Sequence, residues 1–307
     1  MQELESEELM VDGQAIKVNL WRVGDRKIVS LDSFVKTARI EEEEYEDVED
    51  PAATIDALRE ADPKPDIFTF VQRLPETEPK YSYYREWESI AAIPITTYDH
   101  WLKKQVDPTA RNKVRKAQKA GVIVREVDFT DEFVKGMVNI FNETPVRQGR
   151  PFWHYGKDFE TVKKQFSRNL FREDLFGAYY NDDLIGFIFL AYAGKYAMLG
   201  QIVSKIEHRE KAPNNVLIAK AVEVCEKKKI PYLVYALWVE GSLGEFKRNN
   251  GFEKINLPRY YCPLTAKGKI VLKLNLHHGL RGIIPENLKV RLKNIRKKWY
   301  ARKWGNI

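Results

Sequence analysis

The segment HREKAPNN, residues 208–215, brings cationic side chains to the start of an apolar helical pattern. His208, Arg209 and Lys211 carry the charge, and Pro213 is of a residue type favoured in the first turn of a helix. That turn has backbone N–H groups without partners inside the helix, and the helix dipole attracts negative charge to them. We therefore predict an anion-binding turn for a pyrophosphate, against the alternative of a solvated basic loop. The predicted cofactor contacts here are His208, Arg209, Lys211, Ala212, Pro213, Asn214 and Asn215.

A second candidate site is the segment NETPVRQGRPFWHYGKD, residues 142–158, which is dense in polar and aromatic residues. Glu143 and His154 are candidate general bases for an incoming amine, His154 because histidine titrates near neutral pH. Arg147 and Arg150 are suited to gripping a carboxylate or phosphate of an acceptor. The alternative is a surface loop whose aromatic residues simply pack. The predicted substrate contacts in this segment are Arg147, Gln148, Arg150 and Tyr155.

The elements between the two segments form a platform for them. Three strand candidates follow in close succession, at residues 175–180, 184–193 and 196–203, and short turns join them. They predict an antiparallel meander. Pro213 then opens a helix with a one-sided apolar stripe that runs to Cys225. The strands make a floor, and the free N–H groups of the following helix can receive an anion.

The remaining chain alternates helices and strands. Residues 75–87 contain two prolines and an aromatic run, which predict an irregular connection. The helix that begins at Pro108 is expected to end at Gly121, a residue type favoured after a helix C-terminus. The other predicted elements are strands at residues 16–20, 27–31, 66–70, 122–127 and 231–239, helices at 51–60, 97–105, 131–141, 159–170 and 242–251, and strand material from 259 to 276.

Charge is unevenly distributed along the 307 residues. The net charge is +7, yet residues 41–50 form an acidic block, and basic clusters lie at 111–119 and 289–303. The second cluster belongs to a predicted basic helix at 286–303. Both clusters could meet phosphates of a nucleic acid, a cofactor or lipid headgroups, or they could be solvated helix faces.

The cysteine and hydropathy patterns predict the compartment. Cys225 and Cys262 have no framework spacing and are read as reduced, buried thiols. The longest apolar run, near residues 184–193, is too short to cross a bilayer. We expect a cytoplasmic protein, with peripheral attachment to a membrane surface as an option. No metal is expected, because the pair His277 and His278 has no Asp, Glu or Cys at ligand spacing.

Two longer stretches carry a family resemblance. Residues 203–235, followed by FKRNNGFEKI at 246–255, resemble the acetyl-CoA-binding core of the GNAT superfamily, and Phe246, Gly251 and Phe252 match its terminal FxxxxGF element. Residues 102–127 together with APNN resemble the Fem-type branch, which includes the peptidoglycan bridge aminoacyltransferases. The likeness spans about Ile93 to Leu276. It implies a GNAT fold of α/β class, with a mixed, mostly antiparallel central sheet flanked by helices.

Departures from the superfamily pattern are informative. The usual turn reads Q/R-x-x-G-x-G/A, whereas here Arg209 is followed by Ala212 and Asn214 at the glycine positions, so the cofactor cradle is altered. A tyrosine that protonates the leaving thiolate in many GNAT enzymes would fall near Phe246 or Lys247, and neither is tyrosine. Lys247 instead matches the Fem-type FK pair, whose lysine is thought to polarise the reacting carbonyl. The alternative is an ordinary surface lysine.

The resemblance also implies where the donor carbonyl lies. In GNAT folds the backbone N–H of a splayed strand polarises it, which corresponds here to residues 199–202, and Gly200 would permit the bulge. The cofactor contacts implied on this strand are Gln201, Ile202 and Val203. Tyr261, on the last predicted strand pair, is a candidate acceptor contact, with aromatic core as the alternative.

These observations predict an N-acyltransferase that moves an acyl group from acetyl-CoA or another acyl-CoA to an amine by direct attack. The acceptor is expected to be a small molecule, a peptide or a glycan precursor. Alternatives are an aminoacyl-tRNA donor bound through the basic helices, and a non-catalytic GNAT-like binding module. The predicted domains are 1–92, a small α/β domain that could be a degenerate GNAT-like half, 93–276, the acyltransferase domain, and 277–307, a basic helical tail.

Overall fold

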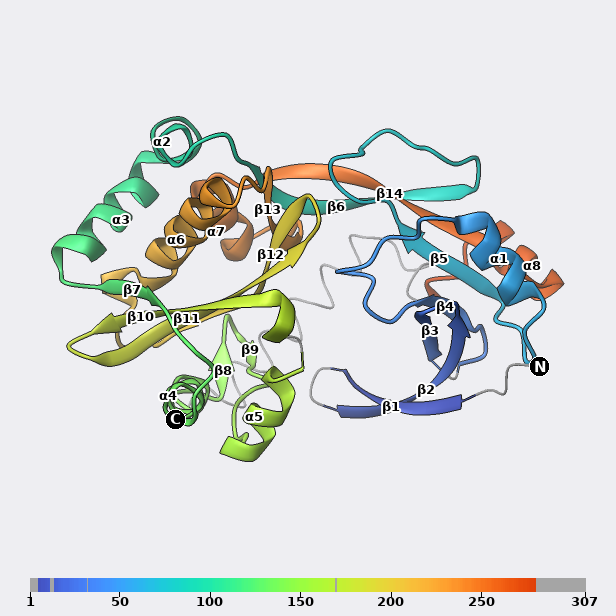
Figure 1. Ribbon diagram of the computed structural model, residues 1–307, viewed down its shortest axis with the longest axis horizontal. Coiled ribbons are helices and arrows are strands. Elements are labelled where there is room, and N and C mark those ends of the chain that lie inside the picture. The colour runs from blue at the N-terminus through green and yellow to red at the C-terminus, as the bar shows by residue number, and fades with distance from the viewer. Residues whose placement is uncertain (1–4, 12–13, 32, 169, 280–307) are drawn as a thin grey trace. The chain divides into compact units, whose positions relative to one another are not determined.

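The computed structural model describes residues 5–11, 14–31, 33–168 and 170–279 (Figure 1). The predicted basic helix at 286–303 lies outside these residues. The chain forms two compact units. Unit 1 comprises residues 1–88, 146–153 and 257–307, and unit 2 comprises 89–145 and 154–256. Each unit is thus assembled from separated segments, and the predicted domain boundaries, which follow chain order, remain predictions.

Unit 1 is built on a small sheet whose strands follow the order β1-β2-β3-β4-β5-β14. The strands predicted at residues 16–20 and 27–31 are confirmed, and they belong to β2 and β3, which pair antiparallel on either side of Gly24. The core beneath helix α1 contains Trp21, Phe68, Phe70 and Tyr260, all almost fully buried. Its elements are β1 (Glu5–Val11), β2 (Gln14–Val23), β3 (Arg26–Leu31), β4 (Thr37–Ile40), α1 (Pro51–Arg59), β5 (Ile67–Val71), the end of β14 (Glu253–Pro263) and α8 (Ala266–Lys273).

Unit 2 has a sheet of order β6-β13-β12-β11-β10-β7, in which the β12–β13 pair is parallel and the other pairs are antiparallel. The predicted meander is therefore confirmed as β10 (Glu173–Tyr180), β11 (Asp183–Ala193) and β12 (Tyr196–Ser204). The other elements are β6 (Tyr84–Pro94), α2 (Tyr98–His100), a π-helical turn (Trp101–Gln105), α3 (Pro108–Lys119), β7 (Ile123–Glu126), α4 (Asp131–Phe141), α5 (Phe159–Phe166), α6 (Pro213–Lys227), β13 (Tyr232–Leu237) and α7 (Ser242–Asn249).

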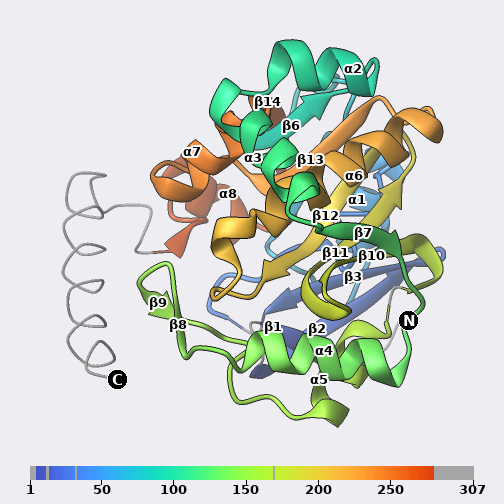
Figure 2. The same ribbon diagram turned by 90° about the vertical axis from the view of Figure 1, so that its left-hand side faces the viewer.

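Helices cover both faces of this sheet, α3 and α6 on one and α4 and α5 on the other (Figure 2). The alternation of β11 explains the arrangement, since neighbouring strand residues point to opposite faces. Ile188 and Leu190 join the core beneath α6, whereas Phe187 and Phe189 contact Phe133 of α4. The predicted α/β fold with a mostly antiparallel central sheet and flanking helices is confirmed.

Two sequence predictions are wrong. The aromatic run that predicted an irregular connection enters strand β6, whose later residues Ile90–Ile93 are buried. The strand material predicted up to residue 276 ends at Pro263, and the chain continues as helix α8, which Thr265 caps. The Thr265 hydroxyl accepts the Gly268 N–H, which caps the first turn of this helix.

Burial of the thiols agrees with the sequence prediction, because Cys225 and Cys262 are both unpaired and buried. Burial raises the pKa of each thiol to about 12, so neither is a ready nucleophile. Within the described residues, no helix has both the length and the apolar character needed to span a bilayer.

Candidate active site

Strand β12 carries the predicted bulge. Its pairing with β11 shifts between Phe189, which lies opposite Gln201, and Leu190, which lies opposite Leu199, so Gly200 is the extra residue. A Cβ atom on Gly200 would lie 3.6 Å from the nearest atom, an ordinary contact, so the glycine is permitted here and not demanded. The bulge turns the backbone of residues 199–201 out of the regular ladder.

Strands β12 and β13 stop pairing with each other just before the bulge at Gly200. Their parallel pairing runs from Tyr196 and Tyr232 to Met198 and Val234, and no later pair joins them among the described residues. Beyond Val234, strand β13 is irregular, and Ala236 adopts a left-handed conformation with φ of 47°. The bulge on one strand and the irregular stretch on the other therefore follow directly after the last shared pair. At this opening the facing edges of β12 and β13 no longer pair with each other.

Lys247 is not a surface lysine. Its side chain is 2% exposed, and Nζ donates hydrogen bonds of 2.7 Å to the carbonyl oxygens of both Tyr235 and Leu237. Nζ also lies 4.4 Å from the centre of the Tyr235 ring. Burial lowers the pKa of Lys247 to about 8, so the ammonium form still prevails at neutral pH. An ammonium has three hydrogens, and these two bonds leave the third for another acceptor.

The predicted anion-binding turn directly precedes helix α6. Ala212 is left-handed, with φ of 52° and ψ of 45°, the conformation for which glycine is the usual residue. Side chains cap the N-termini of α1 to α5 and α8, whereas α6 and α7 have no capping side chain. In the first turn of the 15-residue helix α6, Pro213 has no N–H and the Asn215 N–H donates to the Ala212 carbonyl oxygen at 3.1 Å, so the Asn214 N–H is the donor left for another acceptor.

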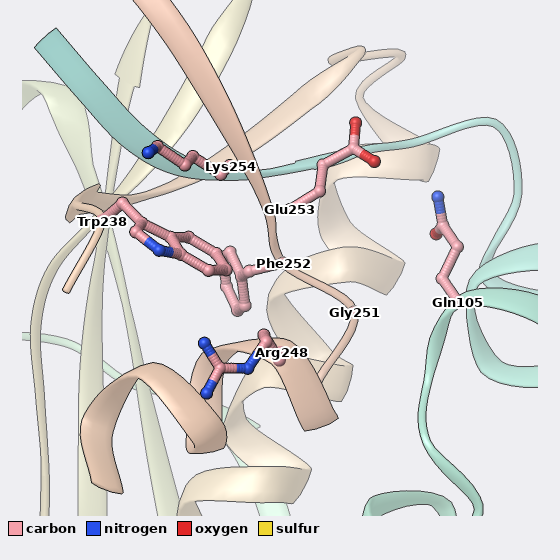
Figure 3. A pocket seen from close by; sticks show the side chains of 7 residues that line it. All are labelled: Gln105, Trp238, Arg248, Gly251, Phe252, Glu253 and Lys254. Atoms are coloured by element: carbon pink, nitrogen blue, oxygen red, sulfur yellow. The ribbon is translucent and has the colours of Figure 1, made fainter. Parts of the chain in front are cut away.

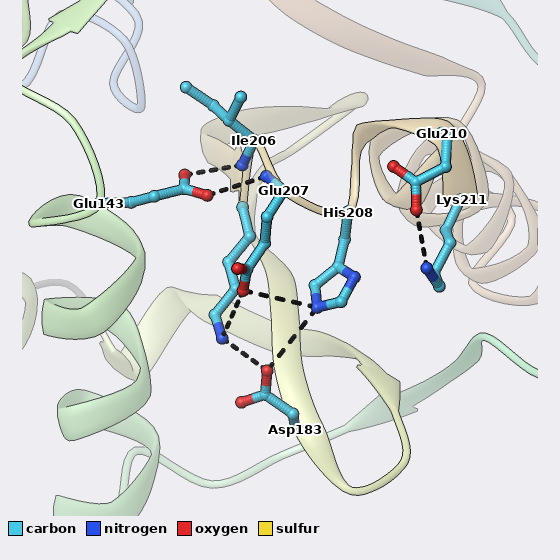
Figure 4. A network of polar contacts seen from close by, with 8 residues as sticks. Glu143, Asp183, Ile206, Glu207, His208, Glu210 and Lys211 are labelled. Atoms are coloured by element: carbon cyan, nitrogen blue, oxygen red, sulfur yellow. Dashed lines mark hydrogen bonds and ion pairs between the residues drawn. The ribbon is translucent and has the colours of Figure 1, made fainter.

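Glu143 anchors the loop before that turn (Figure 4). Its two carboxylate oxygens accept the backbone N–H groups of Ile206, at 2.6 Å, and Glu207, at 2.9 Å. Both oxygens are thus engaged by the loop that leads from β12 to α6. This geometry favours a positioning role, and the predicted role of Glu143 as a general base stays a prediction.

The cationic side chains of the turn differ in their availability. Lys211 pairs with Glu210 at 2.7 Å and lies over the Tyr180 ring, while His208 lies 3.6 Å from Glu207 (Figure 4). Arg209 is exposed. Of the three predicted cations, Arg209 is therefore the one best placed to meet an incoming anion.

His154 and Gln201 are brought together. The two side-chain Nε2 atoms lie 3.3 Å apart, and the His154 ring is fully buried against Phe141, with centroids 4.1 Å apart. Gln201 belongs to the bulge on β12. His154 thus contacts strand β12 at its bulge while it is shielded from solvent. Its predicted role as a base stays a prediction.

Several predicted cofactor contacts hold the framework together. Asn215 is buried and donates to Asn250 Oδ1 at 2.9 Å, and Asn250 in turn donates to the Phe246 carbonyl at 2.7 Å. This chain of bonds ties α6 to the helix that carries Lys247. Asn214 is partly exposed, whereas Pro213 and Val203 are buried and Ile202 packs on the core.

The predicted acceptor contacts fall in different units. Arg147, Gln148 and Arg150 lie in unit 1, in a small hairpin of β8 (Val146–Arg147) and β9 (Arg150–Pro151), and Gln148 has a φ of 53° in its turn. Tyr155 belongs to unit 2 and is exposed. Tyr261, in unit 1, is 5% exposed and packs with Ile67 and Leu272, as the aromatic-core alternative expected.

One feature of unit 2 was missed from the sequence. A pocket of about 410 Å³ lies where α7 ends (Figure 3). Arg248 and Lys254 bring positive charge to it, and the Trp238 indole forms part of its wall, with Nε1 donating to Glu240 at 3.0 Å. The clustered charges of FKRNNGFEK are the only sequence signal for it. The lining residues are Gln105, Trp238, Arg248, Gly251, Phe252, Glu253 and Lys254.

Comparison with known proteins identifies the fold. No protein-family model matches the sequence, and no curated protein is significantly similar to it. Among solved structures, FemX is 13% identical, with a TM-score of 0.53 over 84% of this chain and 88% of that one. A C-terminal domain assigned to a lysylphosphatidylglycerol synthetase from Agrobacterium fabrum is 11% identical, with a TM-score of 0.53 over 83% and 87%. L-PGS from Bacillus licheniformis is 11% identical, with a TM-score of 0.52 over 83% and 87%.

At such identities the similarity is one of fold. It covers most of the chain, and so it extends beyond the segments that carry the sequence motifs. The bulge at Gly200 lies within residues 199–202, where the resemblance implied a splayed strand. The chain has the fold of FemX and of the two lysylphosphatidylglycerol synthetase structures.

Proposed function

We propose that this protein is an N-acyltransferase that transfers an acyl group from an activated donor to a primary amine. The observation that carries the proposal is the opening between β12 and β13, with the bulge at Gly200 on one side and the buried Lys247 on the other. Backbone donors and an ammonium group near one opening are suited to stabilising an oxyanion.

The reaction would proceed in a ternary complex, without a covalent enzyme intermediate. The neutral amine attacks the donor carbonyl carbon and forms the new C–N bond, and the carbonyl oxygen becomes an oxyanion. Backbone N–H groups of residues 199–201 and the ammonium of Lys247 stabilise that charge. Collapse breaks the bond from carbon to the leaving sulfur or oxygen. The proton that the nitrogen loses then passes to solvent or to the leaving group.

The proposed donor is an acyl-CoA. Support comes from the uncapped N-terminus of α6 and from Arg209 beside it, which suit a pyrophosphate. The proposed acceptor is an amine on a small molecule, a peptide or a glycan precursor. We place the protein in the cytoplasm, at an anionic membrane surface where the acceptor requires it.

A second candidate donor is an aminoacyl-tRNA. Helix α3, which packs against α6, exposes Lys113, Arg115, Lys116 and Lys119, a face suited to phosphates. Binding through such a face weakens steeply with salt, because each phosphate contact releases condensed counterions. CoA thioesters, which offer few phosphates, would show a much smaller salt dependence.

The test uses the full chain with a panel of acyl-CoA thioesters and aminoacyl-tRNAs. Donor binding is followed by the thermal midpoint, and amide products are detected by mass spectrometry with a panel of amines. We expect one donor class to raise the midpoint and to yield product that is lost in Lys247→Ala and kept in Lys227→Ala, a matched change at an exposed lysine. If no donor of either class binds, the chain is better explained as a non-catalytic GNAT-like module.

A further inference from the structure

Unit 1 contains a cluster of two imidazoles and one carboxylate that the proposed reaction does not use. His277 Nε2 lies 2.9 Å from Glu86 Oε1, and His278 Nε2 lies 2.7 Å from Glu86 Oε2. The two histidine rings are 4.1 Å apart between centroids. One ligand atom from each of the three residues lies within 4.8 Å of the others. Each imidazole therefore directs its Nε2 atom at the carboxylate of Glu86.

The surroundings hold these groups in place. The side chain of His277 is fully buried, with its ring 4.6 Å from that of Tyr261 and 5.9 Å from that of Tyr84. Tyr84 also donates a hydrogen bond of 3.4 Å to Glu86 Oε1. Glu86 and His278 remain partly exposed, at 30% and 45%. One side of the cluster is thus fixed by aromatic packing, and the other is open to solvent.

The hydrogen bonds of the cluster leave one buried polar atom unsatisfied. The two imidazole rings share a single carboxylate, and the buried Nδ1 atom of His277 has no hydrogen-bond partner among the described residues. A neutral imidazole is the form that binds a metal ion, and the neighbouring carboxylate offsets the charge of a divalent cation. The same three side chains can thus serve as hydrogen-bond partners without an ion and as ligands with one.

We propose that Glu86, His277 and His278 bind a divalent transition-metal ion of the zinc class. Two imidazole nitrogens and one carboxylate are a donor set that zinc accepts, with a fourth, open position left for water. The ion would fasten the segment after α8 to strand β6. The described residues contain a second acidic and histidine cluster at Asp183, Glu207 and His208. There the Lys205 ammonium lies 2.5 Å from Asp183 and 3.4 Å from Glu207, so a cation is already supplied.

Zinc titration of the full chain tests the proposal. The protein is prepared without a histidine tag, stripped with a chelator, and titrated with Zn²⁺ by calorimetry. We expect one equivalent to bind. Glu86→Gln and His278→Ala, both at partly exposed positions, should weaken binding by more than the roughly 10–100-fold that loss of a supporting group costs. His100→Ala, at an exposed histidine in unit 2, is the matched control and should bind as the wild type does.

Two further measurements distinguish specific binding at this site from nonspecific binding of zinc. The Co²⁺ form should show the intense visible absorption of a four-coordinate site, and Zn²⁺ should raise the thermal midpoint of the wild type and of His100→Ala but not of the two site variants. A chain that binds no zinc, or site variants that bind it with unchanged stoichiometry and affinity, would overturn the proposal. Neither result bears on acyl transfer, because the cluster lies apart from Lys247 in sequence and in unit.

Discussion

The side-chain nitrogen of Lys247 lies 2.7 Å from the carbonyl oxygen of Tyr235, and the ring of the same tyrosine lies beneath it at 4.4 Å. Tyr235 is the first residue of β13 beyond the last pair with β12. The two contacts therefore hold an ammonium group at the point where the strands part. A lysine held this firmly loses little freedom when a substrate arrives, which is the preorganisation that charge stabilisation requires.

Replacement of Lys247 by methionine should remove activity without unfolding the chain. Methionine keeps most of the volume of the side chain and removes the desolvated charge. We expect kcat/KM to fall on the order of 10²–10³-fold, the range found when one oxyanion donor is removed. Circular dichroism should remain that of the wild type. Lys227→Met, the same change at an exposed position of α6, should leave both unchanged. Unchanged turnover in Lys247→Met would remove the residue from the mechanism.

The burial of Lys247 also predicts how stability depends on pH. Its folded-state pKa is about 8 and its ordinary value is 10.5, so between these values the unfolded chain keeps a proton that the folded chain has lost. The free energy of unfolding should therefore rise with pH in that window, relative to Lys247→Met, by up to about 3 kcal/mol. Below pH 8 the difference between the two proteins should be flat. Urea unfolding at a series of pH values measures it, and a difference that falls from pH 8 to 10 would contradict the assignment.

Local signals predicted much of unit 2. Pro213 opens α6, Gly121 follows α3 with a φ of 86°, and Thr130 caps α4, each as its residue type indicates. Strand β6 escaped prediction because its first residues, YREWES, lack a clear alternation and only its later residues are buried. Their place in a sheet is decided by neighbours that are distant in sequence.

The candidate site was less predictable for the same reason. Nothing in the sequence near Lys247 indicates burial, since the carbonyls that bind it belong to a strand ten and twelve residues earlier. Glu86 meets His277 across 191 residues, so the histidine pair showed no carboxylate at ligand spacing. Spacing rules find sites within one element, whereas these sites depend on tertiary contacts.

Glu143→Gln should distinguish an anchor from a base. The amide can accept only one of the two backbone N–H groups that the carboxylate now accepts, so the loop at Ile206 and Glu207 loosens. We expect KM for the donor to rise, with little change in kcat and a loss of stability of about 1 kcal/mol. Steady-state kinetics over a range of pH measures both. Glu132→Gln, at an exposed position in the first turn of α4, is the control. A large fall in kcat with loss of the acidic limb of the pH profile would establish Glu143 as the base instead.

Helix α7 lies so close to the loop before it that Gly244 has no room for a side chain. A Cβ atom there would lie 2.1 Å from the carbonyl oxygen of Val239, so the helix that carries Lys247 would have to shift. Gly244→Ala should cost about 1–3 kcal/mol and lower activity together with stability. Gly200→Ala should leave stability nearly unchanged, because a Cβ atom fits beside the bulge. Thermal unfolding of the two variants checks the contrast, and equal losses in both would refute it.

Two glutamates of the acidic block at residues 41–50, Glu43 and Glu49, should differ in how much they contribute to the free energy of unfolding. Glu43 is 8% exposed, and its carboxylate accepts hydrogen bonds from both terminal nitrogens of Arg259, at 2.9 and 3.1 Å. The Glu88 carboxylate accepts a third hydrogen bond, from Arg259 Nε at 2.7 Å. Glu49, with a side chain that is 86% exposed, pairs with Arg26 at 3.4 Å on the surface. Removal of one partner from a buried pair leaves the other charge uncompensated, which typically costs about 3–5 kcal/mol, whereas exposed pairs contribute about 0–1 kcal/mol. The Glu43→Gln variant keeps one oxygen that can accept from Arg259, and the Glu88 carboxylate still pairs with that arginine. We therefore expect Glu43→Gln to cost about 3 kcal/mol, the lower end of the range for buried pairs, and Glu49→Gln to cost nearly nothing. Chemical unfolding of both variants measures the difference, and because Glu43 lies in unit 1, a probe in that unit should report the loss. Equal stability of the two variants would mean that water reaches the Arg259 pair as readily as it reaches the surface one.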